Sequence, residues 1–400
     1  MFSLTFEGGP LPAITILTLV IVAPIALLTG FFALELFLGL PRGRDGPAAP
    51  SDASAVIVVP AHDEAKLIAA TVARLLKVAE GRCRLLVVAD NCTDETAEEA
   101  RSTGAEVLVR DDPANRGKGH ALAAARDHLR GDPPDAVVVI DADSRIDSGS
   151  LRRVISVALK ANRPAQAVYL FTPDRKAPPL VQISNFALMI KNLVRLRGLQ
   201  RLAGRAHLTG TGMAFPWPLF EQSSLGGSNI VEDLVVGLEL AEQGHAPLLA
   251  DGATVWSEPA AKDETLVQRS RWEGGYLATA LRIAPALFAR SVRRGDLAGI
   301  AAAVDLAIPP LALLVMLNAL ALSAAILACA IGGAMWPAFI LVVTGALAFL
   351  ALGLAWIREG RPFASGATLL RLPLYVLWKL PMYLRFARRG APKEWVRTAR

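Results

Sequence analysis

Three long apolar stretches constrain this chain more than any other feature of its sequence. They cover residues 11–40, 306–331 and 336–357 of a 400-residue chain. An apolar helix of roughly 20 residues is long enough to cross the hydrocarbon core of a bilayer. The intervening region, from about 51 to 285, has the composition of soluble protein. The sequence therefore predicts one soluble domain joined to a membrane part with three spans.

Charged residues beside the apolar stretches predict the orientation of the chain. Arg42 and Arg44 follow the first stretch directly, whereas Glu7 is the only charged residue before it. By the positive-inside rule the amino terminus lies outside and the soluble domain lies in the cytoplasm. The missing basic n-region argues against a cleaved signal peptide. An uncharged turn at 332–335 and the following Arg358 return the chain to the cytoplasmic side.

Other residues refine the expected membrane part. Glu35 lies inside the first stretch, where we expect it either to snorkel to the interface or to pair with a neighbouring helix. Pro309 and Pro310 should break or kink the helix ahead of the second stretch, because proline lacks a backbone donor. The segment 369–386 mixes aromatic, basic and proline residues, so we expect it to lie at the interface.

The net charge and the cysteines limit the possible partners. The formal net charge of +6 comes largely from positions that flank the apolar stretches. Such charges favour anionic lipid headgroups, so we expect contact with membrane lipids and none with nucleic acid. Cys83, Cys92 and Cys329 form no CxxC pair, and the histidines have no metal-ligand spacing. Neither a zinc cluster nor a disulfide framework is predicted.

The soluble region contains short apolar runs rich in β-branched residues, which predict buried strands. They cover residues 54–60, 85–89, 106–109 and 136–140. Helical patterns lie between them at about 64–79 and 93–103, with Asp63 and Thr93 available as caps. This alternation predicts a parallel sheet covered by helices.

Acidic residues follow several of these predicted strands directly. Asp90 follows the second strand, and Asp141 and Asp143 follow the fourth. Ligands of such sheets bind beyond the carboxyl ends of the strands, so these side chains should converge. Clustered carboxylates repel one another unless a hard divalent cation lies among them, and that cation would carry nucleotide phosphates. A single aspartate would more often be a turn residue, but several strand ends together favour a binding site.

Short motifs in a fixed order carry a family resemblance. They are Asp90, Asp141-Ala142-Asp143, Glu232-Asp233 and Gln268-Arg269-Ser270-Arg271-Trp272, the last with the QxxRW pattern. With the flanking apolar stretches they resemble the family 2 glycosyltransferases, especially the membrane-embedded subgroup that includes cellulose and hyaluronan synthases. The resemblance implies a GT-A fold, an α/β Rossmann-like mixed sheet, with about three transmembrane helices and interfacial amphipathic helices.

The same resemblance implies a division of the chain. The expected parts are an N-terminal transmembrane helix at 1–42, a cytoplasmic GT-A domain at 51–285, an interfacial helix and transmembrane hairpin at 286–365, and an amphipathic, basic C-terminal region at 366–400. The protein would be a multi-pass protein of the cell (inner) membrane, with its catalytic domain and carboxyl terminus in the cytoplasm.

On the donor side, the resemblance assigns roles residue by residue. Glu64 and Asp90 would hold the uracil or ribose end of a UDP-sugar, and Asp141 would contact the donor nearby. Asp143 would coordinate Mg²⁺ or Mn²⁺ on the diphosphate. Lys118 lies in a glycine-rich basic segment whose lysine is near the nucleotide in this family, and the segment lacks the spacing of a Walker A loop.

The chemistry of sugar transfer suggests further roles. The leaving nucleoside diphosphate needs a metal and cations to stabilise its charge, and Arg271 fits that need. Inversion at the anomeric carbon needs a carboxylate that removes the proton of the attacking hydroxyl. We expect Asp233 to be this base and the Glu232-Asp233 pair to be catalytic, at the start of a helix.

The acceptor side is assigned by the resemblance alone. Gln268 and Trp272 would lie near the acceptor sugar, and Gly210 and Thr211 resemble the acceptor-side loop of the family. A processive polysaccharide synthase that uses a UDP-sugar is the first hypothesis, with a possible homo-oligomer or secretion partner. A hexosyltransferase that adds one sugar to a lipid, ceramide or polyprenyl-linked, is the alternative. A transporter or scaffold is disfavoured, because the expected spans carry few polar residues.

Overall fold

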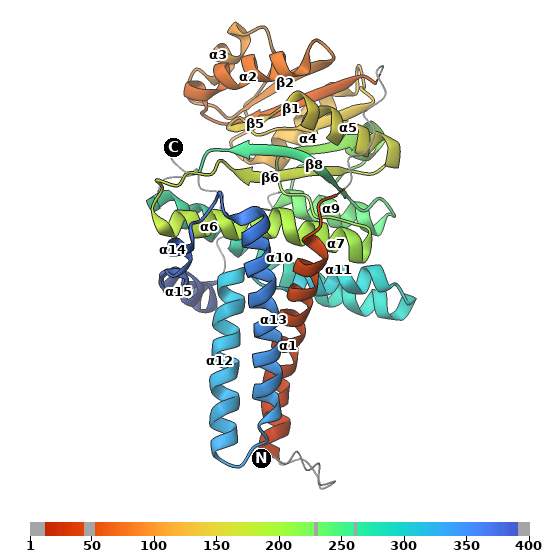
Figure 1. Cartoon of the computed structure of the whole chain (residues 1–400). Helices are drawn as coiled ribbons and strands as arrows, with labels where there is room; N and C mark the ends of the chain where they lie inside the picture. The colour runs from red at the N-terminus through yellow and green to blue at the C-terminus, as the bar shows by residue number, and fades with distance from the viewer. Residues whose placement is uncertain (1–12, 44–52, 228–230, 260–261, 391–400) are drawn as a thin grey trace.

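The computed structural model describes residues 13–43, 53–227, 231–259 and 262–390. A sheet with its covering helices forms one end of the molecule, and three long helices form the other (Figure 1). A layer of helices lies between these two parts. The predicted N-terminal helix and the predicted C-terminal region extend over residues 1–12 and 391–400, which lie outside the described residues.

The sheet has eight strands in the order β3-β2-β1-β4-β7-β6-β8-β5. The strands are β1 Ala55–Ala61, β2 Cys83–Asp90, β3 Glu106–Arg110, β4 Ala136–Val139, β5 Ser144–Ile146, β6 Ala165–Phe171, β7 Met213–Pro216 and β8 Leu248–Ser257. The four expected strands are present, and they pair in parallel with one another. The prediction of a wholly parallel sheet is wrong, because β7 runs antiparallel to β4 and β6, and β5 runs antiparallel to β8. The sheet is mixed, as the family resemblance implied.

The apolar runs are continuous because both faces of the sheet are buried. In β1, Ile57 and Val59 pack on one face, and Val56 and Val58 pack on the other. The first face is covered by α2 Ala65–Ala79, α3 Thr96–Ser102 and α5 Ser148–Ala161. The second is covered by α4 Lys118–Leu129, α8 Trp217–Glu221 and α9 Glu232–Glu242.

The predicted helix caps are wrong. Neither α2 nor α3 has a side-chain bond from its N-cap residue, and Asp63 instead accepts bonds from the backbone and hydroxyl of Thr93. Asp94 takes the capping role, since its carboxylate accepts from the amides of Ala65 (3.1 Å) and Thr96 (3.1 Å). One side chain therefore ties the first turns of both helices to the ends of β1 and β2.

The middle layer lies beneath the sheet. It contains α6 Pro179–Met189, the π-helical turn η1 Ile190–Arg195, α7 Leu196–Ala203, α10 Lys262–Arg294, α11 Leu297–Ala307, α14 Gly366–Leu369 and α15 Leu372–Arg389. Helix α10 continues without a break through Pro285, where the expected soluble domain ends. The division of the chain into domains stays a prediction.

Three helices are long and apolar enough to cross a membrane by length and composition. They are α1 Ala13–Gly39, α12 Leu311–Ala330 and α13 Trp336–Ala355, the last continued by η2 Trp356–Gly360. They lie side by side, and α12 and α13 form a hairpin (Figure 1). Pro310 immediately precedes α12, so the expected break is present. Helix α15 is not among the three, and its interfacial position remains a prediction.

Glu35 is fully buried near the end of α1 and does not snorkel. Its carboxylate accepts from Arg195 Nε at 2.9 Å, and Arg195 also donates to Asp305 Oδ1 at 2.5 Å. The pairing alternative is therefore the observed one, and the partner comes from the helical layer under the sheet. A charge is tolerated here because it is paired and hydrogen-bonded.

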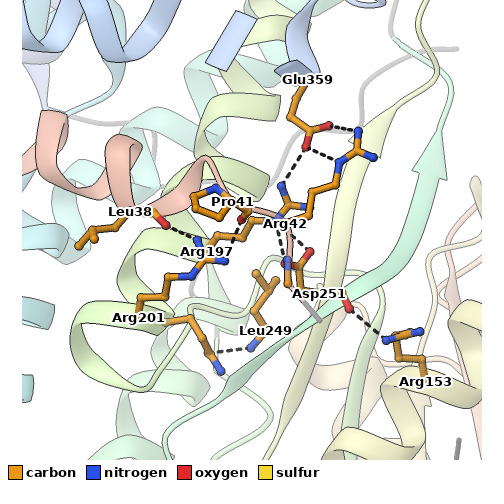
Figure 2. A network of polar contacts seen from close by, with 11 residues as sticks. Leu38, Pro41, Arg42, Arg153, Arg197, Arg201, Leu249, Asp251 and Glu359 are labelled. Atoms are coloured by element: carbon orange, nitrogen blue, oxygen red, sulfur yellow. Dashed lines mark hydrogen bonds and ion pairs between the residues drawn. The ribbon is translucent and has the colours of Figure 1, made fainter. Parts of the chain in front are cut away.

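A second polar network joins the long helices to the sheet (Figure 2). Arg197 of α7 donates to Asp251 of β8 at 2.8 Å and to Glu359 at the end of α13 at 3.1 Å. Arg42, just after α1, donates to the same Glu359 at 3.2 Å, and Gly43 donates its amide to Asp251 at 2.7 Å. The ends of two long helices nearest the sheet are thus fixed against it.

We expect Arg197→Met to destabilise the protein, because it removes the cation paired with the partly buried Asp251 and one of the two cations paired with Glu359. Breaking such a pair costs about 3 kcal/mol, which lowers the unfolding temperature in detergent by on the order of 5 °C. The matched control is Arg84→Met, which removes an exposed pair with Asp132. Equal unfolding temperatures for the two variants would contradict the structural role of the network.

Candidate active site

A cavity of about 1040 Å³ lies at the carboxyl ends of β1, β2 and β4. Asp90 from the end of β2 and Asp141 and Asp143 after β4 all line it, so these acidic strand ends meet in one place. Glu64, which follows β1, lines the same cavity. This is the edge of the sheet at which ligands of α/β folds bind.

Asp90 is paired with a cation that the sequence analysis missed. Its Oδ1 accepts from Arg110 Nη1 at 2.5 Å, and Arg110 also donates to Asp112 at 2.8 Å. Asp90 and Arg110 are register partners at the ends of two parallel strands, β2 and β3. The signal in the sequence that could have revealed this pair is the basic residue at the end of the neighbouring strand. The repulsion expected among the acidic groups is therefore reduced by the protein itself.

Lys118 is a cation that lines the cavity itself. It is the first residue of α4, and its ammonium donates to Asp141 Oδ1 and, at 2.6 Å, to the carbonyl of Gly210. Burial opposes the charge, but the carboxylates of Asp141 and Glu232 hold the pKa of Lys118 above its ordinary value. Lys118 thus stays charged and connects the donor-side strand end to the Gly210 loop.

Asp143 offers the oxygen chemistry that a hard cation prefers. Its Oδ1 accepts from Ser144 Oγ at 3.2 Å and Ser257 Oγ at 3.5 Å, and the residue lines the cavity. Asp141 lies two residues earlier and uses Oδ1 for Lys118. Carboxylate oxygens at this spacing fit Mg²⁺ or Mn²⁺ better than a soft metal.

Glu232 and Asp233 open α9 and face the same cavity. Burial, and then the neighbouring Asp233, raise the pKa of Glu232 to about 8. Burial also raises the pKa of Asp233, while Lys118 and Lys191 act in the opposite direction. A carboxylate with a raised pKa is a stronger proton acceptor, which suits a general base.

The Gly210 loop lies against Asp233. Gly210 has a φ of +91°, and a Cβ at this position would lie 3.4 Å from Asp233 Oδ2. Thr211 differs from the expected acceptor contact, because its side chain is fully buried and its Oγ1 accepts from the Asp141 amide at 3.0 Å. It positions the Asp141 backbone, whereas Gly210 itself lines the cavity.

Helix α10 brings the QxxRW residues to the opposite wall. Gln268, Arg271 and Trp272 line the cavity. Burial lowers the pKa of Arg271, and Glu232 and Asp141 counteract this, so the guanidinium faces the acidic side of the cavity. The Trp272 ring stacks on Phe171 with centroids 6.3 Å apart and an interplanar angle of 11°.

One cluster near the cavity could not be seen from sequence spacing. Side-chain ligand atoms of His62, Asp63 and Cys92 lie within 4.8 Å of one another. Asp63 Oδ1 also accepts from the Thr93 amide at 2.6 Å, and His62 Nδ1 lies 2.7 Å from the Asp90 carbonyl. Burial raises the pKa of the Cys92 thiol. We interpret this cluster as a connection between the ends of β1 and β2.

The match to a known family covers the sheet and most of the site. Residues 52–275 match the profile described as glycosyltransferase-like family 2. The chain belongs to this family. It is a glycosyltransferase with a GT-A-like α/β fold. No curated protein matches the sequence.

Three solved structures are similar to this chain, and the first of them shows the same fold. The mannosyltransferase PcManGT from Pyrobaculum calidifontis, in complex with GDP-Man and Mn²⁺, is 20% identical, with a TM-score of 0.55 over 92% of this chain and 99% of that chain. The glucosyl-3-phosphoglycerate synthase of Mycobacterium tuberculosis is 18% identical, with a TM-score of 0.37 over 57% of this chain and 85% of that chain. The mannosyl-3-phosphoglycerate synthase of Rubrobacter xylanophilus is 20% identical, with a TM-score of 0.37 over 61% and 76%.

Proposed function

We propose that this protein is an inverting, metal-dependent glycosyltransferase that uses a nucleotide-activated sugar at the cytoplasmic face of a membrane. The observation that carries the proposal is the single cavity into which Asp143, Lys118 and Asp233 all project from separate elements. This arrangement can hold a diphosphate at one end and remove a proton at the other. Three apolar helices support membrane attachment.

The strand-end side of the cavity suits the donor. Glu64 and Asp90 lie where β1 and β2 end and are placed to accept from the base or ribose of UDP. Lys118 and Arg271 face the middle of the cavity, where they would stabilise the charge of the diphosphate. Asp143 would hold Mg²⁺ or Mn²⁺, with Asp141 beside it. The bound metal would supply Lewis-acid stabilisation of the leaving group.

Asp233 would act as the base. An acceptor hydroxyl would transfer its proton to Asp233 as its oxygen bonds to the anomeric carbon and the bond to the diphosphate breaks. Buried Glu232, with a pKa of about 8, stays mostly protonated near neutral pH and leaves Asp233 as the charged member of the pair. Trp272 offers an aromatic surface beside this point for the acceptor.

A processive polysaccharide synthase remains a candidate within this proposal. The specific observation in its favour is that Gln268, Arg271 and Trp272, the residues of the QxxRW motif, all line the cavity. The alternative is a single addition to a lipid acceptor. Both use the same donor, metal and base.

Substitution of the proposed base and metal ligand should separate chemistry from binding. Asp233→Asn should keep metal-dependent nucleotide binding and slow sugar transfer by roughly 10²–10⁴-fold, because only proton removal is lost. Asp143→Ala should lose metal-dependent nucleotide binding as well. Calorimetric titration with UDP and with GDP in the presence of Mn²⁺, followed by transfer assays with UDP-sugars and GDP-mannose, measures both effects.

The matched control for these substitutions is Asp132→Asn, whose side chain is 82% exposed and lies far from the cavity wall. It should behave as the unchanged protein in both assays. Equal loss of nucleotide binding in the Asp233 and Asp143 variants would contradict the separate roles.

As the pH is lowered, the rate of transfer should begin to fall at a pH above the ordinary pKa of an aspartic acid side chain. Asp233 must be ionised to act, and burial raises its pKa above 3.8, so the ionised fraction falls as pH decreases through this raised value. The measurement is the transfer rate against pH at saturating donor and Mn²⁺. A rate that stays constant down to the ordinary pKa of aspartic acid would argue against Asp233 as the base.

A further inference from the structure

A second, narrow cavity of about 80 Å³ adjoins the active-site cavity on its membrane-proximal side. Lys191, Trp272 and Tyr276 line both cavities, so the two adjoin at this point. The second cavity extends to Leu311 and Ala312 at the start of α12. Together the two cavities reach from the surroundings of Asp233 to the side of a candidate membrane span.

The walls of the second cavity are mainly apolar. Leu188, Ile308 and Leu311 line it, together with the ring of Tyr375. Such walls offer few hydrogen-bond partners for the hydroxyl groups of a sugar chain, whereas they suit a hydrocarbon chain. A volume of about 80 Å³ admits no row of sugar rings and has room for the first few methylene groups of a hydrocarbon chain.

The junction of the two cavities carries a positive charge. The Lys191 side chain is exposed to the cavity, and among the described residues its recorded side-chain contact is with the Tyr276 ring, 5.4 Å from the centroid. Two other cations nearby are already paired, Arg195 with Glu35 and Asp305 and Lys379 with Glu273. Lys191 forms no such close ion pair among the described residues, and the carboxylates of Asp233 and Glu273 act on it only at longer range.

Arg269 adds to the positive charge at the junction. Its guanidinium lies beside the stacked rings of Phe171 and Trp272, 5.2 and 5.1 Å from their centroids. Its Nε donates to Ser184 Oγ, and its Nη2 has no hydrogen-bond partner among the described residues. An unpartnered donor on a buried cation favours an anionic acceptor close by.

We propose that the acceptor is a membrane lipid whose head group carries both a hydroxyl and an anionic group such as a phosphate. Its hydrocarbon chain lies in the second cavity, its anionic group lies at Lys191, and its hydroxyl reaches Asp233. The hydroxyl oxygen bonds to the anomeric carbon, the bond to the nucleoside diphosphate breaks, and Asp233 takes the proton. This inference rests on the proposed donor and base chemistry, and it selects a single addition to a lipid over growth of a polymer.

Binding of dodecyl phosphate to the full-length protein in detergent, loaded with UDP and Mn²⁺, tests the lipid site. Quenching of tryptophan fluorescence reports binding, because Trp272 lines both cavities. We expect Lys191→Gln to weaken the binding of dodecyl phosphate at least 10-fold, and Lys191→Arg to retain most of the affinity of the unchanged protein. Dodecanol should bind more weakly than dodecyl phosphate to the unchanged protein and should be insensitive to Lys191→Gln.

A second pair of variants tests the apolar path. Ala312→Phe fills the second cavity and should weaken the binding of dodecyl phosphate by a similar factor. Ala319→Phe adds the same ring to the exposed face of the same helix and should have no effect. Nucleotide binding with Mn²⁺ verifies that each variant is folded.

The outcomes separate this inference from the proposed function. Unchanged dodecyl phosphate affinity in Lys191→Gln and Ala312→Phe, with normal UDP binding, would overturn the lipid site alone. A labelled product that stays in the aqueous phase as polymer would also overturn it. Failure of the unchanged protein to bind any nucleotide with Mn²⁺ would overturn the donor chemistry on which the inference depends.

Discussion

The contact of the Lys118 ammonium with Asp141 and with the Gly210 carbonyl holds the two sides of the active site together. Asp141 belongs to the strand-end motif, and Gly210 lies against the Asp233 carboxylate. One buried cation therefore sets the relative position of the proposed metal site and the proposed base. Its charge persists in a buried position because carboxylates surround it. Lys118 and Arg110 partly neutralise the acidic residues at the strand ends.

The polar layer under the sheet explains how the cavity is held against the long helices. Arg195 pairs with Glu35 of α1, and Arg197 pairs with Glu359 at the end of α13. Both arginines come from the continuous segment of η1 and α7, which also contains Lys191 at the cavity junction. The segment thus places one cation toward the active site and two toward the long helices. This shared origin makes the position of the proposed acceptor site dependent on the position of the spans.

The sequence predicted the helices and strands better than the contacts between them. The four strands, the three apolar helices and the position of Asp233 at a helix start follow from local pattern, which depends on nearby residues. The antiparallel β7, the Arg110 partner of Asp90 and the capping role of Asp94 depend on residues distant in the chain. Thr211 shows the same limit, since the family resemblance pointed to its loop but could not show that its side chain faces inward. Pair contacts of this kind arise from tertiary packing, which motif spacing does not encode.

The anomeric configuration of the product tests the central claim most directly. A single cavity with the base on one side and the metal-held diphosphate on the other permits one displacement, which inverts the anomeric carbon. Nuclear magnetic resonance of the product formed from an α-linked nucleotide sugar should therefore show a β linkage. A product with retained α configuration would contradict the assignment of Asp233 as base in a single displacement.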